Sequence, residues 1–266
     1  MTIIDPNAWK APELGSDIPG GDMPGDKIRI GEDHVHKAKL IFPLLIAEIN
    51  RLVREDPARR RFVVSVYGGS GVGKSETASL LGYYLREAGI GTYIMSGDNY
   101  PHRIPKFNDA ERERVYNEGG IDALKAYLGS ELEINFKEVN ELLRQFHAGE
   151  DKIYLRRMGR GETELWYEPV DFSNVEVLIL EWTHGNNAIL RGIDIPVFLS
   201  STPAETLAHR MARGRDGNPD GPFITMVLGF EQALLTSQVE SAKIIVSKAG
   251  EIISADEYLE RVHAEN

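Results

Sequence analysis

The sequence predicts a three-layer α/β fold built on a five-stranded parallel sheet. Short runs of β-branched and aromatic residues alternate with longer stretches whose apolar residues recur at helical spacing, which is typical of a parallel sheet covered on both faces. A glycine-rich loop joins the first predicted strand to the helix that follows it. The predicted strands span residues 62–67, 91–95, 175–180, 195–199 and 243–246.

Helices are predicted between these strands. Residues 40–53 carry their apolar side chains on one face, with Pro43 in the first turn or at a kink. Residues 109–149 are helical in pattern and contain one long apolar stripe. Pro203 suits the first position of a helix over 203–213. The other predicted helices span residues 76–88, 226–241 and 255–263.

The distribution of glycine and proline suggests how the chain is organised. Residues 1–35 are dense in both and show no sustained period, which predicts an extended N-terminal arm. We expect residues 36–266 to form one domain with a helical insertion at about 100–170. Residues 213–222 are rich in glycine, proline and arginine, which predicts a loop that can act as a lid.

Composition excludes several classes of protein. The 266 residues carry a net charge of −11, which argues against a nucleic-acid partner or an anionic membrane surface. The absence of cysteine excludes disulfides, thiolate metal sites and a cysteine nucleophile. Neither a secretory signal nor an apolar run of membrane-spanning length is present, so we expect a cytoplasmic protein.

One motif predicts phosphate binding. The segment Gly68-Gly69-Ser70-Gly71-Val72-Gly73-Lys74-Ser75 matches the pattern G-x-x-x-x-G-K-[ST], the phosphate-binding loop or P-loop. Its glycines let backbone N–H groups converge on phosphate, Lys74 places a positive charge on the β and γ oxygens, and Ser75 offers a hydroxyl to Mg²⁺. A strand before the loop and a helix after it are the context that the motif requires. We therefore predict that ATP is bound by Gly68, Gly69, Ser70, Gly71, Val72, Gly73, Lys74, Ser75 and Glu76.

A P-loop alone does not distinguish a switch, a motor and a kinase. A GTPase would carry an Asn-Lys-x-Asp segment to recognise guanine, and the sequence contains no Asn-Lys pair. A large ATPase would normally have a longer chain and an acidic pair closing its third strand. A kinase needs an acceptor pocket, a group that takes or orients the proton of the acceptor hydroxyl, and arginines that close over the phosphates.

Candidates for these kinase roles follow the predicted strands. We expect Asp98 at the carboxyl edge of a strand beside the P-loop strand, where it would orient the acceptor or hold Mg²⁺ through water. Glu181 ends the third strand and suits a metal–water network. Arg210, Arg213 and Arg215 surround the predicted lid. Each also has a simpler interpretation: a turn aspartate, a solvent-facing carboxylate at a strand end, and a solvated helix end.

In this order the features resemble the uridine kinase and phosphoribulokinase group of P-loop kinases, over about residues 60–250. The resemblance rests on the P-loop and on the segments 96–103, 136–154, 175–181 and 207–213. It implies a P-loop NTPase-type fold, Asp98 as the proton acceptor, an acceptor-binding insertion and an arginine-bearing lid. The segment Gly97-Asp98-Asn99 followed by His102 is also similar to adenylylsulfate kinase.

Combined with the resemblance, these residues give a full set of expected roles. The expected catalytic residues are Lys74, Asp98, Arg213 and Arg215. The expected metal ligands, direct or through water, are Ser75, Asp98 and Glu181. The expected acceptor-binding residues are Asp98, Tyr100, Arg103, Arg156, Arg157 and Glu181.

Departures from the family pattern concern mainly the acceptor. Glu76 replaces a second hydroxyl residue after the lysine, and Trp182 stands where the uridine kinase group has glycine. The segment that frames a nucleoside base in that group is replaced here by residues 153–156. We therefore expect an acceptor other than uridine. The cluster of Arg156, Arg157 and Arg160 would suit an anionic acceptor, such as a sugar phosphate or a sulfonucleotide, or would form a solvated hairpin.

The sequence thus predicts an ATP- and Mg²⁺-dependent kinase that phosphorylates a hydroxyl group of a nucleoside, sugar or sugar phosphate. Adenylylsulfate kinase and a nucleotide-dependent regulatory ATPase are the alternatives. The expected partners are ATP and a small-molecule acceptor, with no nucleic acid and no membrane. A homodimer is left open.

Overall fold

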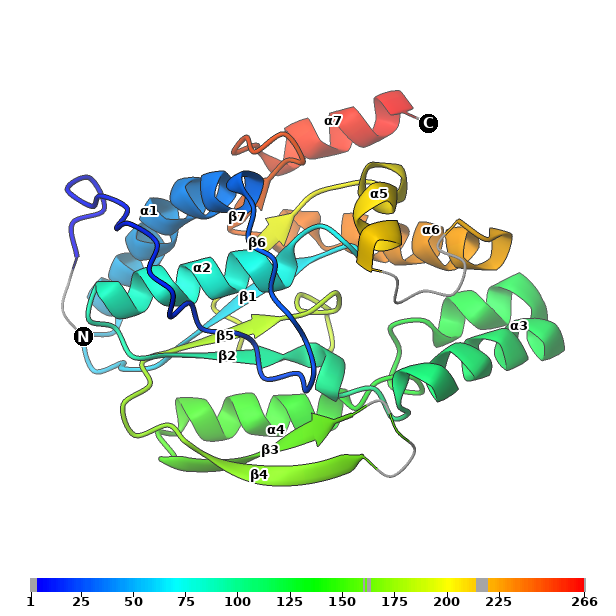
Figure 1. The fold of residues 1–266 in the computed structure, drawn as a ribbon, viewed down its shortest axis with the longest axis horizontal. Helices are drawn as coiled ribbons and strands as arrows, with labels where there is room; N and C mark the ends of the chain where they lie inside the picture. The colour runs from blue at the N-terminus through cyan, green and yellow to red at the C-terminus, as the bar shows by residue number, and fades with distance from the viewer. Residues whose placement is uncertain (1–3, 160, 162–163, 214–219, 266) are drawn as a thin grey trace.

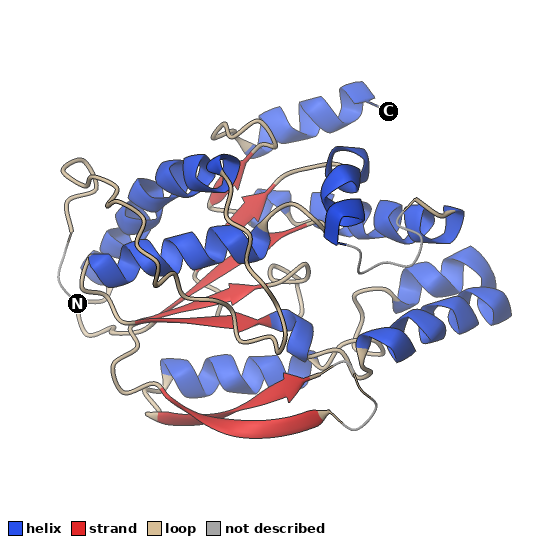
Figure 2. Ribbon diagram, in the orientation of Figure 1, coloured by secondary structure: helices blue, strands red, loops and turns tan. Residues whose placement is uncertain are grey.

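The computed structural model describes residues 4–159, 161, 164–213 and 220–265. Its centre is a parallel sheet of five strands in the order β2-β5-β1-β6-β7 (Figures 1 and 2). The strands are β1 (Phe62–Gly68), β2 (Thr92–Ser96), β5 (Val177–Glu181), β6 (Ile195–Leu199) and β7 (Ile244–Val246). The predicted three-layer α/β fold is confirmed, because helices cover both faces of this sheet.

The alternation of side chains along the strands creates the two covered faces. In β1, Phe62, Val64 and Val66 pack with α1 (Glu32–Glu55) and α2 (Lys74–Glu87). The intervening Val63 packs with α4 (Phe136–His147), and Tyr67 packs with α6 (Pro222–Thr236) and α7 (Ala255–Glu265). Because successive strand residues point to opposite faces, all seven residues of β1 are buried.

The strand order corrects one expectation. We expected Asp98 to follow a strand beside β1, but β5 lies between β1 and β2. The register aligns Val66 of β1 with Glu181 of β5, and Glu181 with Ser96 of β2. Of the two candidate carboxylates, the one that follows a strand beside β1 is therefore Glu181, and Asp98 lies one strand further away.

The insertion between β2 and β5 is only partly helical. The predicted helix over 109–149 is two helices, α3 (Pro105–Tyr127) and α4, and α3 is kinked at Gly120. An antiparallel hairpin, β3 (Lys152–Met158) and β4 (Leu165–Asp171), follows them. The predicted strands do not include it, although a solvated hairpin was the alternative interpretation of Arg156, Arg157 and Arg160. The neighbouring residues Trp166 and Tyr167 of β4 point to opposite faces and both are exposed, so the simple alternation of polar and apolar residues that marks a strand is weak here.

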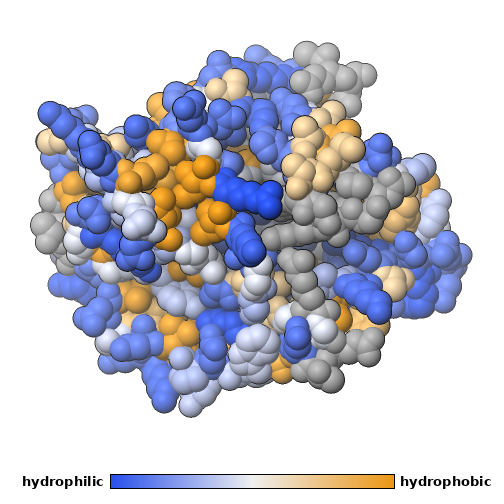
Figure 3. Space-filling model, viewed as in Figure 1, coloured by the Kyte–Doolittle hydropathy of each residue, from blue (hydrophilic) through white to orange (hydrophobic). Residues whose placement is uncertain are grey.

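Residues 4–31 contain no helix or strand and run over α1, α2 and the ends of the strands (Figure 1). Trp9 packs against Phe42 of α1, with ring centroids 4.4 Å apart and the ring planes tilted by 37°. Tyr83 of α2 accepts a hydrogen bond from the backbone N–H of Gly15 and donates one to the carbonyl of Glu13. In Figure 3, apolar side chains gather on this face of the molecule, next to strongly hydrophilic ones near its centre. The arm is thus packed onto the body along its length.

The remaining helices complete the fold. The first helix begins at Glu32 rather than at residue 40, with Pro43 inside it. The helix predicted over 226–241 is α6, followed by the short 3₁₀ helix η2 (Val239–Ser241). The helix α5 (Pro203–Arg213) lies where it was predicted. Within the described part of the chain, no helix is long and apolar enough to cross a membrane.

Close packing between Gly97 and Trp182 fixes the turn that carries Asp98. Gly97 begins the 3₁₀ helix η1 (Gly97–Asn99), and a Cβ atom at this position would lie 1.9 Å from Cγ of Trp182. The Trp182 ring is 1% exposed and packs against Phe136, with ring centroids 5.5 Å apart. The ring cannot withdraw, so only glycine fits opposite this tryptophan.

We therefore expect Gly97→Ala to lower the free energy of unfolding by about 1–3 kcal/mol, because the added methyl group overfills a packed core. Urea denaturation at 25 °C measures the change. Gly229→Ala is the matched control, since Gly229 lies in α6 with no atom within 4 Å of the added Cβ. The control should be neutral or more stable, by up to about 1 kcal/mol. Equal stability of the two variants would contradict the packing argument.

Candidate active site

The P-loop connects β1 to α2 through glycines that no other residue could replace without strain. Gly68, Gly71 and Gly73 have φ angles of 151°, 80° and 94°. A Cβ at Gly68 would lie 2.4 Å from the carbonyl oxygen of Leu199, and one at Gly71 would lie 2.9 Å from Cγ of Arg210. Backbone alone thus fills the bend before the α2 N-terminus, where N–H groups can converge on an anion. This cradle fits a nucleotide phosphate chain.

Three structural elements bring their polar side chains together beside the P-loop. The Ser75 hydroxyl, in the first turn of α2, lies 3.1 Å from Oε2 of Glu181 at the end of β5. The Ser96 hydroxyl, at the end of β2, lies 2.6 Å from Oε1 of the same carboxyl group. Lys74 donates a hydrogen bond to the carbonyl oxygen of Gly69, 3.0 Å away. A hydroxyl paired with a carboxyl group is a donor set that suits Mg²⁺.

The Glu181 carboxyl has an unusual electrostatic environment. Burial, and next the negative charge of Asp98, raise its pKa to about 8, although hydrogen bonds from Ser96 and Ser75 and the charge of Lys74 oppose the shift. Only 4% of the residue is exposed. A buried acid with a strongly raised pKa beside a P-loop is typical of a functional site rather than of a core position.

Asp98 is solvent-exposed in η1, at the carboxyl edge of the sheet. Its negative charge acts on both Glu181 and Glu231, which places it near the P-loop lysine and α6. The next residue, Asn99, holds the turn: its side-chain carbonyl accepts a hydrogen bond of 2.9 Å from the Met158 backbone N–H. The hairpin β3–β4 thereby supports the position of Asp98.

Two of the expected acceptor-binding residues, Tyr100 and Arg103, make their contacts within the protein. The Tyr100 ring is fully buried in the core and its hydroxyl contacts the sulfur of Met95, so the expectation that it binds acceptor is wrong. Arg103 bonds Tyr127 and Glu111. Its guanidinium therefore links the N-terminal half of α3, at Glu111, to the last residue of that helix, Tyr127.

The two hairpin arginines are buried rather than exposed. Arg157 is 4% exposed and forms ion pairs with Asp22 at 2.8 Å and Glu168 at 2.6 Å, so its charge is already balanced within the protein. Arg156 is 5% exposed and lies 3.9 Å from Glu138. The expectation of an anion-binding arginine cluster at this hairpin is not supported, and Arg160 lies outside the described residues.

The predicted lid is described only at its base. Arg210 of α5 lies against Gly71 and donates a hydrogen bond to the carbonyl of Pro203, 3.0 Å away. Arg213 ends α5, but its side chain and the whole of Arg215 lie outside the described residues. Their roles in catalysis therefore stay predictions.

Two features of the site have no counterpart in the sequence analysis. The first is the N-terminal arm, which lines a cavity of about 160 Å³ at the P-loop together with Gly73, Ser75 and Glu76. The proline and glycine of the arm predict its irregular path but give no indication of its partners. The second is a buried ionic network on the other side of Lys74.

This network joins residues from α3, the turn before α4 and α6. Arg112 bonds Glu133 at 2.6 Å and Glu231 at 3.3 Å, and Glu133 accepts a further hydrogen bond from the Gly129 backbone N–H at 2.7 Å. His184 is buried, with 8% of the residue exposed, and the charges of Glu133 and Arg112 both act on its ring. Because the members are up to 119 residues apart in the chain, no local pattern could reveal them.

A larger cavity opens beside this network, with a volume of about 610 Å³. Its polar lining includes Ser70 of the P-loop and the charged side chains of α3 and α6, and its apolar lining comes from the first turns of α6. The charge of Lys74 acts on Glu231, so the cavity lies near the end of the P-loop where the lysine points. Among its lining residues are Asp109, Arg112, Glu113, Phe223, Val227 and Glu231.

Similar proteins are consistent with this geometry. A stretch of 195 residues, 73% of this chain, is 50% identical to part of the bifunctional alpha-galactosidase/sucrose kinase AgaSK from Mediterraneibacter gnavus. The chain spans about 21% of the length of that relative. No protein-family model matches the chain.

Solved structures show where the fold recurs. Phosphoribulokinase from Rhodobacter spheroides superposes with a TM-score of 0.53 at 17% identity, covering 71% of this chain and 70% of that one. D-glycerate 3-kinase from Cryptococcus neoformans var. grubii superposes with a TM-score of 0.52 at 14% identity, covering 82% of this chain and 97% of that one. This protein therefore shares its fold with these two structures, which confirms the P-loop NTPase-type three-layer fold expected from the sequence.

The environment of His184 generates a prediction about acid stability. Burial lowers the pKa of His184 from 6.5 to about 4. Between these two pH values the imidazole is protonated in the unfolded chain but stays neutral in the folded protein. Stability is therefore lost as the pH falls from 6.5 towards 4, with His184 accounting for about 2 kcal/mol at pH 5.

We expect His184→Asn to reduce by about this amount the difference in unfolding free energy between pH 7.5 and pH 5, measured by urea denaturation at each pH. His263→Asn is the control, because His263 is exposed on α7. A pH dependence that is the same in both variants would show that His184 is not held neutral by its surroundings.

Proposed function

We propose that this protein is an ATP- and Mg²⁺-dependent kinase that phosphorylates a hydroxyl group of a neutral sugar. The observation that carries the proposal is the convergence of the P-loop, with Lys74 and Ser75, and Glu181 at one edge of the sheet. The chain is also 50% identical over 195 residues to part of a protein whose name includes sucrose kinase. Bound Mg²⁺ would screen the phosphate charges, and Ser75 and Glu181 are the residues placed to hold it.

Each side chain at the site has a distinct part in this proposal. The P-loop N–H groups hold the phosphates, and Lys74 can exchange its contact with the Gly69 carbonyl for the β and γ oxygens. Asp98 is placed to accept or orient the proton of the acceptor hydroxyl, since it lies exposed near Glu181 and Glu231. Arg213 and Arg215 are proposed to close over the phosphates.

The cavity of about 610 Å³ between α3 and α6 is the proposed acceptor pocket. Among the described residues that line it are three carboxyl groups, those of Asp109, Glu113 and Glu231, and one guanidinium, that of Arg112, which pairs with Glu231. Carboxylates accept hydrogen bonds from hydroxyl groups but repel phosphate and sulfate. The apolar side chains of Phe223 and Val227 offer a surface to the C–H face of a sugar ring.

This lining favours a neutral acceptor over the anionic one that the arginines of the hairpin suggested. Arg157 is paired with Asp22 and Glu168, so it offers no uncompensated charge to a sugar phosphate or to adenylylsulfate. Adenylylsulfate kinase activity is therefore the weaker alternative.

An acceptor panel tests the function. ATP consumption is measured with sucrose, monosaccharides, their phosphates, uridine, adenylylsulfate and no acceptor, with Lys74→Ala as the inactive control. We expect neutral sugars alone to stimulate turnover, because the pocket walls are acidic. Stimulation by a phosphorylated or sulfated acceptor would refute the assignment of the pocket. Steady ATP hydrolysis without any acceptor would instead support a regulatory ATPase.

The role of Asp98 is tested separately with Asp98→Asn, which keeps the shape but removes the charge. We expect kcat to fall by a factor of about 10²–10⁴ with unchanged affinity for a non-hydrolysable ATP analogue. Asp122→Asn, at an exposed position of α3, is the matched control. If Asp98→Asn loses Mg²⁺-dependent nucleotide affinity at unchanged kcat, Asp98 belongs to the metal shell and another group takes the proton.

A further inference from the structure

The N-terminal arm is fixed to the candidate active site by one buried carboxylate. Asp22, whose side chain is 8% exposed, accepts hydrogen bonds from the Ser96 backbone N–H at 2.7 Å and from the Asn99 side-chain amide at 3.1 Å. The Tyr93 hydroxyl lies 3.0 Å away, and Arg157 pairs with Asp22 at 2.8 Å. The anchor therefore ties the arm to β2, to the turn that carries Asp98 and to the hairpin.

From this anchor the arm crosses the P-loop before it enters α1. A Cβ at Gly21 would lie 3.6 Å from Oε1 of Glu181, so the backbone passes directly over that carboxyl group. Where the arm enters α1, the ring of His34 in the first turn of that helix would lie 2.7 Å from a Cβ at Gly73, the residue before Lys74. The arm is thus held at both ends and spans the phosphate cradle.

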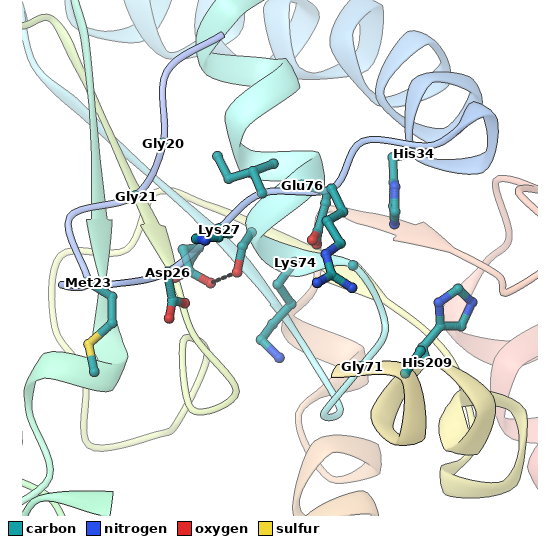
Figure 4. A pocket seen from close by; sticks show the side chains of 16 residues that line it. Gly20, Gly21, Met23, Asp26, Lys27, His34, Gly71, Lys74, Glu76 and His209 are labelled. Atoms are coloured by element: carbon teal, nitrogen blue, oxygen red, sulfur yellow. Dashed lines mark hydrogen bonds between the residues drawn. The ribbon is translucent and has the colours of Figure 1, made fainter. Parts of the chain in front are cut away.

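Between the arm and the P-loop lies the cavity of about 160 Å³ (Figure 4). Lys27 and Arg29 line it from the arm, opposite Lys74 and Ser75. Both arm cations are exposed, and within the described part of the chain neither forms an ion pair or hydrogen bond. Surface cations held beside a phosphate cradle without a carboxylate partner are suited to binding an anionic ligand.

The opposite sign of charge is present in the same cavity. Asp26 and Glu76 also line it, from the arm and from α2. A magnesium nucleotide carries both signs of charge, since its phosphates are anionic and its metal is a dication. The mixed lining therefore matches that ligand better than it matches a bare anion.

We propose that residues 20–34 form one wall of the nucleotide site and that Lys27 and Arg29 bind the phosphates of the nucleotide. This inference rests on the proposed function, because it requires that a nucleotide occupies the P-loop. It makes the arm a part of the binding site instead of an appendage, with Asp22 as the residue that positions it.

The test is the affinity for a non-hydrolysable ATP analogue with Mg²⁺, measured by calorimetry on the full chain. We expect the double variant Lys27→Ala/Arg29→Ala to bind at least about 10-fold more weakly than the wild type, because charged hydrogen bonds to phosphate are lost. The deficit should shrink between 50 and 300 mM salt, since screening weakens the contribution of exposed charges. The matched control is Lys10→Ala/Lys39→Ala, which removes the same charge from exposed residues that do not line the cavity.

A second variant tests the anchor. Asp22→Asn should also weaken binding of the nucleotide analogue. The thermal stability of Lys27→Ala/Arg29→Ala should match that of the Lys10→Ala/Lys39→Ala control, because all four lysine and arginine residues are exposed. Wild-type affinity in Lys27→Ala/Arg29→Ala would overturn the inference, and tighter binding would show that the arm blocks the site. Unchanged affinity in Lys74→Ala would instead show that the P-loop does not bind the nucleotide, which would refute the proposed function itself.

Discussion

The carboxyl group of Glu181 is the point at which the separate parts of this site meet. It is buried at the end of β5 and accepts hydrogen bonds from the hydroxyl groups of Ser75, at the start of α2, and Ser96, at the end of β2. A buried carboxyl group is costly unless its oxygens are hydrogen-bonded, so these contacts fix the P-loop helix against two strand ends. The arm backbone at Gly21 then packs over the same group, and Asp98 follows Ser96 by two residues.

The strand order is what allows one residue to hold all of these parts. Because β5 lies between β1 and β2, its last residue faces the P-loop on one side and the Asp98 turn on the other. The fully buried strands need helices on both faces, and the helices that supply this cover also bring α3 and α6 to the lysine end of the P-loop. The cavity near the lysine and the arm cavity thus lie around a single sheet edge, where ligands of open parallel sheets bind.

The features that could be predicted from the sequence are those encoded locally. The strand at 195–199 and the helix at 203–213 were predicted with the observed bounds, because a β-branched run and an N-terminal proline each act within a few residues. The P-loop follows from glycine spacing alone. By contrast, Asp22 and Arg157 are 135 residues apart, and the pairing that buries their charges depends on the completed fold. Arg157 looked like a ligand for an anion because its partner could not be identified from neighbouring residues.

The position of the arm also constrains the order in which the molecule can fold. The arm precedes its partners in the chain: Ser96 lies 74 residues after Asp22, and Arg157 lies 135 residues after it. Closing such long loops is entropically slow, and it requires β2 and the hairpin to be in place already. The first segment of this region to leave the ribosome is therefore among the last to dock. Newly made chains would pass through a stage with a formed sheet and an unfinished phosphate cradle, open on the side that residues 20–34 later cover.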